Sequence, residues 1–207
     1  MRVAPDMESS ACRIMKFTLR YTGKLPSTGN GSAKKPPQKL PVIWAIRNEI
    51  ATQLEGVFLA HPAINSAGSI HSRAAYNVLR VPIMRGGFGF LPLVRVDLET
   101  VCALTIKMLV NHEVGSVVTQ AGDLDNRIKT LLDALRMPKD NEFMGNRPTS
   151  DPCPCLLHDD AMVVDLCVSQ QRWYSRLPQT EKDVELHLDV EVKTARPNFY
   201  TPAFGIE

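Results

Sequence analysis

One stretch decides how the rest of this chain is interpreted: Gly122-Asp123-Leu124-Asp125-Asn126-Arg127-Ile128-Lys129-Thr130-Leu131-Leu132-Asp133-Ala134-Leu135-Arg136. It predicts one amphipathic helix, because its apolar side chains recur at intervals of three and four residues and gather on one face. Asp123 suits the position before the first turn, where a carboxylate accepts unpaired backbone N–H groups. The charged face repeats acid, base and acid at intervals of four, as Asp125, Lys129 and Asp133.

This charged face has two interpretations. In the first, Asp125, Lys129 and Asp133 form ion pairs on a surface helix, each worth a few tenths of a kcal/mol. In the second, Asp123 and Asp125 converge on a divalent cation. Mg²⁺ prefers carboxylate oxygens and water, and it takes only one or two carboxylates from a protein. Lys129, one turn further on, would then neutralise a phosphate.

A second acidic block follows at Leu156-Leu157-His158-Asp159-Asp160-Ala161-Met162-Val163-Val164-Asp165-Leu166. Its apolar run predicts a buried strand. Neighbouring side chains on an extended segment point to opposite faces, so only one of Asp159 and Asp160 can easily join the first acidic cluster. Taken alone, the block is equally typical of a solvated turn before a strand.

Together, and in this order, the two blocks resemble the RusA family of Holliday-junction resolvases, which are crossover junction endodeoxyribonucleases associated with phages and prophages. The matching pattern is Asp-Leu-Asp-Asn-x-x-Lys-x-x-x-Asp-Ala-Leu followed by Leu-x-Asp-Asp-Ala-x-Val-Val, over residues 122–136 and 156–168. The resemblance implies an α+β fold and Mg²⁺-dependent cleavage of branched DNA in recombination and repair, with Mn²⁺ as an alternative ion. It also implies a homodimer, because symmetric cutting of a four-way junction needs two active sites related by a two-fold axis.

The resemblance also assigns roles to individual residues. Asp123, Asp125 and Asp160 would be the catalytic metal ligands, and Lys129 would supply positive charge to the scissile phosphate. Three further polar residues would orient these groups: Asn126, Asp133 and Asp159.

Two departures from the family pattern keep an alternative open. Thr119-Gln120-Ala121-Gly122 stands where the family often has a basic run, and residues 138–155 form an insertion between the acidic blocks. The main alternative is therefore a catalytically inactive DNA-binding protein of the same fold. Two others are weaker: a phosphatase with an aspartate nucleophile lacks the expected residue after the second aspartate, and a sugar transferase lacks a nucleotide-binding unit upstream.

The composition is that of an ordinary globular protein. A chain of 207 residues suffices for one buried domain, so residues 1–207 are predicted to form a single domain. No apolar run is long enough to span a bilayer, and residues 1–8 show no secretory pattern, which favours the cytoplasm. The resemblance implies that the protein is bacterial or phage-encoded. Five cysteines argue against a disulfide framework. Cys12, Cys102 and Cys167 are expected to be buried, and Cys153, Cys155 and His158 are too few for a structural zinc site.

Positive charge is concentrated at the start of the chain. Residues 1–50 carry nine Lys and Arg against three acids, while the whole chain has a net charge of only +2. Residues 22–41 are rich in Pro, Gly, Ser and Lys and predict a basic loop. This distribution suits a phosphodiester substrate, although scattered surface charge would look the same. The residues expected to contact DNA are Lys24, Lys34, Lys35 and Arg127.

The remaining pattern predicts a small mixed β-sheet packed against two or three helices. Strands are expected at 13–21, 93–99, 101–110 and 184–192, with 93–99 and 101–110 forming a hairpin or a bent pair. Helices are expected at 41–56 and 73–79. Arg85, Phe88 and Phe90 have the chemistry to stack on unpaired bases, but the interpretation we favour is that they anchor a loop onto the core.

Overall fold

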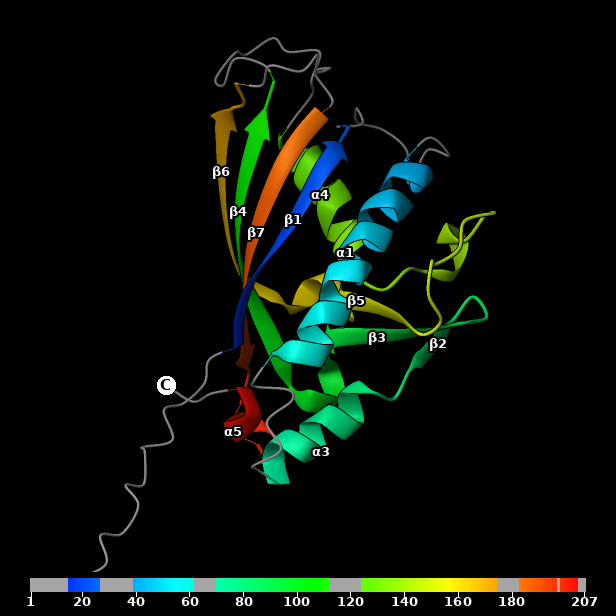
Figure 1. The fold of residues 1–207 in the computed structure, drawn as a ribbon, viewed down its shortest axis with the longest axis vertical. Helices are drawn as coiled ribbons and strands as arrows, with labels where there is room; N and C mark the ends of the chain where they lie inside the picture. Colours follow the sequence, from blue (N-terminus) through cyan, green and yellow to red (C-terminus); the bar gives the residue numbers. More distant parts are fainter. Residues whose placement is uncertain are drawn as a thin grey trace, which may run out of the picture.

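The computed structural model describes residues 15–26, 39–61, 70–111, 124–174, 183–196 and 198–204. This part of the chain forms two mixed β-sheets and four α-helices, an α+β architecture (Figure 1). The larger sheet has the order β1-β7-β4-β6, formed by β1 (Met15–Lys24), β7 (Asp183–Thr194), β4 (Thr100–Val110) and β6 (Val163–Arg172). β7 is antiparallel to both β1 and β4, whereas β6 is parallel to β4.

The larger sheet has one buried and one open face because its strands alternate apolar and polar side chains. Along β7, Val184, Leu186 and Leu188 are buried, and the residues between them are not. α1 (Leu40–Ala60) and α4 (Leu124–Leu135) lie on the buried side (Figure 1). The predicted strand at 184–192 and the predicted helix after Asp123 are therefore confirmed.

The smaller sheet has the order β2-β3-β5 and contains β2 (Ile83–Arg85), β3 (Phe88–Val94) and β5 (Cys153–Leu157). β3 belongs to this sheet and β4 to the larger one, so residues 93–99 and 101–110 do not form the expected hairpin. The strand expected at 93–99 is also wrong beyond Val94, where β3 ends. Between them the chain turns through a 3₁₀ helix, Val96–Leu98, and Glu99 with φ of 50°. Thr100 Oγ1 accepts a hydrogen bond from Arg95 N at 2.8 Å and fixes this bend.

α1 packs against both sheets because it has apolar side chains on more than one face. Ile43, Ile50 and Leu54 join the core of the larger sheet. Trp44 and Ala51 lie on a neighbouring face of the helix and join a smaller apolar cluster with residues of β3 and β5. A helix that is apolar on two sides is buried on two sides.

α3 (Ile70–Leu79) and α5 (Thr201–Phe204) close one end of the molecule (Figure 1). Buried Arg95 holds the C-terminal end of α3, since its Nη1 donates to the carbonyls of Val78 at 2.9 Å and Val81 at 2.8 Å. Val78 lies in the last turn, whose carbonyl groups have no partner within the helix. Its carbonyl also accepts from Val81 N at 3.1 Å, so Arg95 reinforces the turn that ends α3.

Two further expectations need correction. β6 is a strand but not a buried one, because it is paired on one side only; Val164 is 60% and Leu166 40% exposed. Cys167 on this strand is exposed, in contrast to Cys102, which is buried; Cys12 lies outside the described residues. The segment 138–155, expected as an insertion, supplies a 3₁₀ turn (Asp140–Glu142) and the start of β5.

The Gly-Gly-Phe segment anchors a loop, as the favoured interpretation predicts. Phe90 is fully buried, and Phe88 stacks on Phe143 with ring centroids 5.9 Å apart. Arg85 is exposed at the hairpin tip.

Candidate functional site

The first turns of α4 present an acid and a base to solvent. Ile128, Leu131 and Leu135 on the other face are buried in the core, which orients the helix. Asp125 Oδ2 and Lys129 Nζ are 2.6 Å apart, and both side chains are about two-thirds exposed, at 63% and 66%. The ion pair of the first interpretation is therefore formed, and both groups face solvent where a ligand can approach.

The other expected residues of α4 have different partners. Asp133 pairs with Arg136 at 2.7 Å. Asn126 accepts a hydrogen bond from the Thr130 hydroxyl through its backbone carbonyl at 2.8 Å. Arg127, expected to contact DNA, is completely buried, so its guanidinium is not presented to a DNA backbone in this structure.

The second acidic block forms the turn before β6. Asp159 Oδ1 accepts a hydrogen bond from Ala161 N at 3.0 Å and caps the 3₁₀ turn Asp160–Met162. This bond holds the pKa of Asp159 below its usual range, with help from the side chain of Asp160 and the positive charges of Arg136 and Lys139. Both carboxylates are exposed.

The topology separates the two acidic blocks along the long axis of the sheet. β4 and β6 are parallel, so Val163 lies beside Cys102, near the start of β4. α4 follows the end of β4, and Asp125 lies in its first turn. The positive charge of Arg136, one residue beyond α4, lowers the pKa of Asp159, so these two side chains are near each other. Asp125 is in the first turn of α4, whereas Asp160 is next to Asp159 and therefore near the last turn. The twelve residues of α4 span about 18 Å, and the two carboxylates lie toward its opposite ends.

Within the described ranges, no three His, Cys, Asp or Glu side chains lie close enough together to hold a metal ion. Asp123, the third expected ligand, lies outside these ranges. Asp125 has the carboxylate oxygens that Mg²⁺ prefers, and its exposure leaves room for the waters that this ion keeps.

Several predicted features meet at one end of the fold (Figure 1). β1 ends there at Lys24, and α1 begins there at Leu40, on either side of the segment that contains Lys34 and Lys35. β4 ends there and α4 begins there, on either side of the segment that contains Asp123. Lys34, Lys35 and Asp123 themselves lie outside the described residues.

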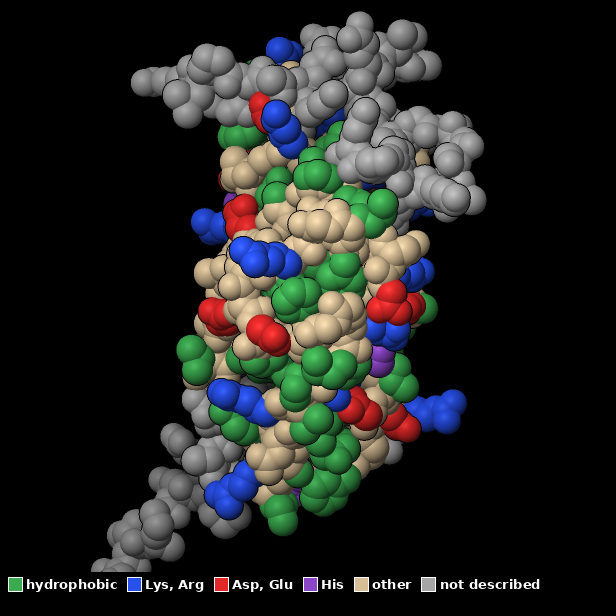
Figure 2. All heavy atoms as spheres, turned by 90° about the vertical axis from the view of Figure 1, so that its right-hand side faces the viewer, with side chains coloured by type: hydrophobic (Ala, Val, Ile, Leu, Met, Phe, Trp, Pro, Cys, Tyr) green, Lys and Arg blue, Asp and Glu red, His purple; other side chains and the backbone are tan. Residues whose placement is uncertain are grey.

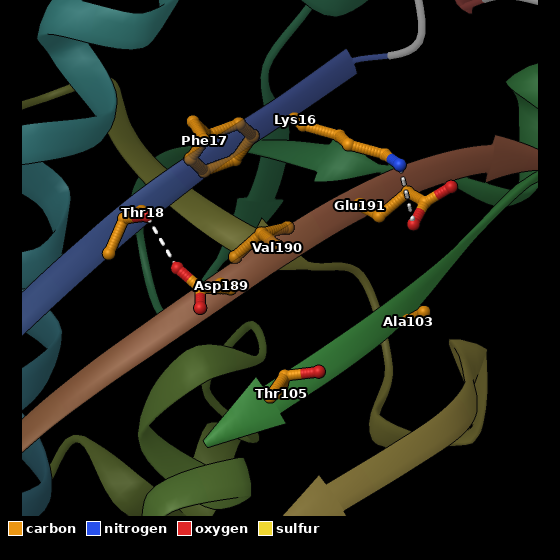
Figure 3. A pocket seen from close by; sticks show the side chains of 8 residues that line it. All are labelled: Lys16, Phe17, Thr18, Ala103, Thr105, Asp189, Val190 and Glu191. Carbon is orange, nitrogen blue, oxygen red and sulfur yellow. Dashed lines mark hydrogen bonds and ion pairs between the residues drawn. The ribbon is translucent and has the colours of Figure 1, made fainter. Parts of the chain in front are cut away.

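A hollow on the described surface is lined by none of the predicted catalytic residues. This shallow hollow lies on the open face of the larger sheet, over β1, β7 and β4 (Figure 3). Its acids are already paired: Glu191 with Lys16 at 3.3 Å, and Asp189 with the Thr18 hydroxyl at 2.5 Å. The face that includes the outer side of α1 mixes acidic, basic and apolar side chains (Figure 2).

Sequence reasoning missed a buried ion network beside α4. Glu142 bonds Arg136 at 2.6 Å and Arg47 at 3.3 Å, and all three side chains are at most 2% exposed. Arg47 Nη2 also donates to the carbonyl of Asp133 at 2.8 Å. The signal for this network was an arginine among the apolar residues of α1, between Ile46 and Ile50.

Comparison with known proteins found no matching family model, no matching curated protein and no matching solved structure. In the described part of the chain, no helix has the length and apolar character to cross a membrane.

Proposed function

We propose that this protein is a Mg²⁺-dependent, structure-selective endodeoxyribonuclease that cuts branched DNA such as four-way junctions in recombination and repair. The observation that carries the proposal is the exposed Asp125–Lys129 pair in the first turns of α4. It stands at the end of the fold where the segments containing Asp123 and the basic lysines leave and rejoin the described structure.

Each residue has a role that its chemistry supports. Asp123 and Asp125 would hold the ion, which, when bound, activates a water and stabilises the leaving oxygen. Lys129 is within ion-pair distance of Asp125 and would neutralise the scissile phosphate when that carboxylate turns to the metal. Lys24, Lys34 and Lys35 would bind the DNA backbone, where each contact releases counterions and makes binding salt-dependent.

Asp160 fits this site less well than the resemblance implies, because it lies toward the other end of α4. This observation favours a second candidate function, a DNA-binding protein of the same architecture that does not cut. Mg²⁺ takes only one or two carboxylates from proteins, so Asp125 together with Asp123, which lies outside the described residues, would still suffice as ligands.

The test is a gel assay with a synthetic four-way junction and a linear duplex of matching sequence, each with Mg²⁺ and with EDTA. We expect paired nicks in the junction alone, and only with the metal. Binding of the junction without cutting, with either Mg²⁺ or Mn²⁺, would support the second candidate. Binding of neither DNA would exclude both functions.

The variant Asp125→Asn assigns the activity to this site. It removes a metal ligand with little change of shape, so we expect cleavage to fall at least about 100-fold while junction affinity changes little. Asp140→Asn is the matched control, because Asp140 is also exposed but lies on the 3₁₀ turn after α4. Equal cleavage by wild type and Asp125→Asn would show that the nuclease site is elsewhere.

A further inference from the structure

The two edges of the larger sheet differ in how they are protected. At the β1 edge, the Gln53 side chain on α1 bonds both backbone groups of Arg20: its Oε1 accepts from Arg20 N at 2.9 Å, and its Nε2 donates to Arg20 O at 2.6 Å. His61 Nε2 lies 3.3 Å from the carbonyl of Lys16 on the same strand. Side chains that occupy the backbone groups of an edge strand prevent another strand from pairing with it.

Among the described residues, the β6 edge has no such cover. In the described part of the chain, no side chain of another element hydrogen-bonds the backbone of Val163–Gln171. The strand is ten residues long and contains neither proline nor lysine, which commonly block pairing at natural sheet edges. Its one irregularity is at the start, where the pairing with β4 skips Val164.

β6 also leaves part of the apolar core uncovered. Leu166 and Val168 pair with Leu104 and Ile106 of β4, which are buried, so all four face the helical side of the sheet. Leu166 is nevertheless 40% exposed, because the helices do not extend over the edge strand. An apolar side chain on the core face of an unpaired edge is typical of a sheet that continues into another chain.

We propose that β6 pairs antiparallel with β6 of a second copy of this chain, about a two-fold axis at Cys167. In this register, Leu166 lies opposite Val168 of the second copy on the helical face, and Asp165 lies opposite its Ser169 on the open face. At these two pairs an apolar side chain meets an apolar one and a carboxylate meets a hydroxyl. Further out, Val164 and Val163 lie opposite Gln170 and Gln171, and no like charges are opposed along the strand. The two larger sheets join into one sheet of eight strands, with both helical layers on the same face.

The order of side chains along β6 favours a second copy of this chain as the partner. About a two-fold axis at Cys167, each residue before Cys167 lies opposite the residue equally far after it in the second copy. A strand that pairs with itself must therefore have compatible side chains at these two positions. Residues 165–169 meet this condition at each pair. The proposal deepens the homodimer that a junction resolvase requires, but it does not depend on nuclease activity. An active monomer would contradict the interface alone, and an inactive dimer would contradict the nuclease alone.

The first test is the mass of the full chain in solution by light scattering and sedimentation. We expect twice the chain mass of 23.0 kDa for the wild type. The double variant Leu166→Lys, Val168→Lys introduces four charges at the seam and should raise the dimer dissociation constant at least about 100-fold. Thr22→Lys is the matched control, because Thr22 is an exposed residue on the protected β1 strand, and we expect it to leave the dimer intact.

The second test needs no charged variant, so it holds even if the double variant fails to fold. In a Cys12→Ser background, mild oxidation should cross-link two chains through Cys167, which is exposed, and Cys167→Ser should abolish the cross-link. A monomer at about 100 µM, about a hundredfold above a micromolar dissociation constant, would overturn the proposal. So would a dimer that survives the double lysine variant, or one whose chains do not cross-link through Cys167.

Discussion

At the residue scale, three charged side chains are buried between α1 and α4: Arg47, Arg136 and Glu142. Burial lowers the pKa of Arg47, and Glu142 opposes that shift. Burial alone would lower the pKa of Arg136 as well, but its bond to Glu142 and the charges of Glu142 and Asp133 raise it. Glu142 therefore compensates the burial of two guanidinium groups and ties the segment after α4 to α1.

Glu142→Gln should lower the free energy of unfolding by about 3 kcal/mol or more. The amide keeps the shape of the side chain but leaves two buried cations with less compensation than a carboxylate gives them. The measurement is urea denaturation followed by circular dichroism. Asp140→Asn on the same turn is the control, and it should change the free energy by less than about 0.5 kcal/mol, since Asp140 is exposed. Equal values for the two variants would contradict the structural role of the network.

Asp159 should make stability depend on pH at the acidic end. The hydrogen bond from Ala161 N lowers the pKa of Asp159 in the folded state. A lowered folded pKa means that the carboxylate stabilises the fold above its ordinary pKa of about 4, and that this stability is lost as the pH falls through the folded pKa. The stability difference between wild type and Asp159→Asn, measured by urea denaturation from pH 7 to pH 3, should therefore shrink at low pH. A constant difference would exclude this contribution.

At the scale of elements, the β2–β3 hairpin shows how one loop is fixed by aromatic packing. Gly86 and Gly87 have φ of 56° and 85°, a region that favours glycine. They differ in surroundings: a side chain on Gly86 would overlap the ring of Phe143, whereas Gly87 faces open space. Phe143 in turn packs on Trp44 of α1, with ring centroids 5.4 Å apart.

Gly86→Ala should therefore cost more stability than Gly87→Ala. Both variants pay about 1–2 kcal/mol for the left-handed backbone. Only the first must also displace Phe143, and overpacking adds about 1–3 kcal/mol. Thermal denaturation of the two variants gives the comparison directly, with Gly87→Ala as the matched control. If the two melted together, the contact between the hairpin and Phe143 would not exist in solution.

At the scale of the whole molecule, the two sheets and α1 enclose three of the four cysteines in the described residues. Burial raises the pKa of Cys102 to about 12 and that of Cys153 to about 11, and it raises the pKa of Cys155 as well. The thiolate is the form of cysteine that reacts. These three thiols therefore react slowly for two reasons: burial keeps reagents away from them, and their raised pKa keeps them protonated.

Thiol labelling should report this enclosure. In a Cys12→Ser background at pH 8, we expect an alkylating reagent to modify Cys167 in native protein, and Cys102, Cys153 and Cys155 only when the fold opens. Mass spectrometry of peptides labelled with and without urea identifies each site. Rapid labelling of Cys153 or Cys155 in native protein would mean that the smaller sheet opens by itself.

The elements with a strong local pattern were predictable from the sequence. Strict alternation at 184–192 and the apolar face after Asp125 each specify an element regardless of its neighbours. The same holds for the Asp125–Lys129 pair, because residues four apart on a helix are adjacent. The second sheet was not predictable: 58 residues, 95–152, separate β3 from β5, and no local pattern encodes their pairing.

The sequence by itself therefore determined the main helices and strands, their buried faces and the acid–base pair that opens α4. The tertiary structure decided which elements meet. It buried Arg127 and Arg47, left β6 at an open edge, and set Asp160 toward the far end of α4 from Asp125 because β6 runs parallel to β4. Periodicity comes from contacts within a few residues, whereas strand order and burial depend on the packing of the whole chain.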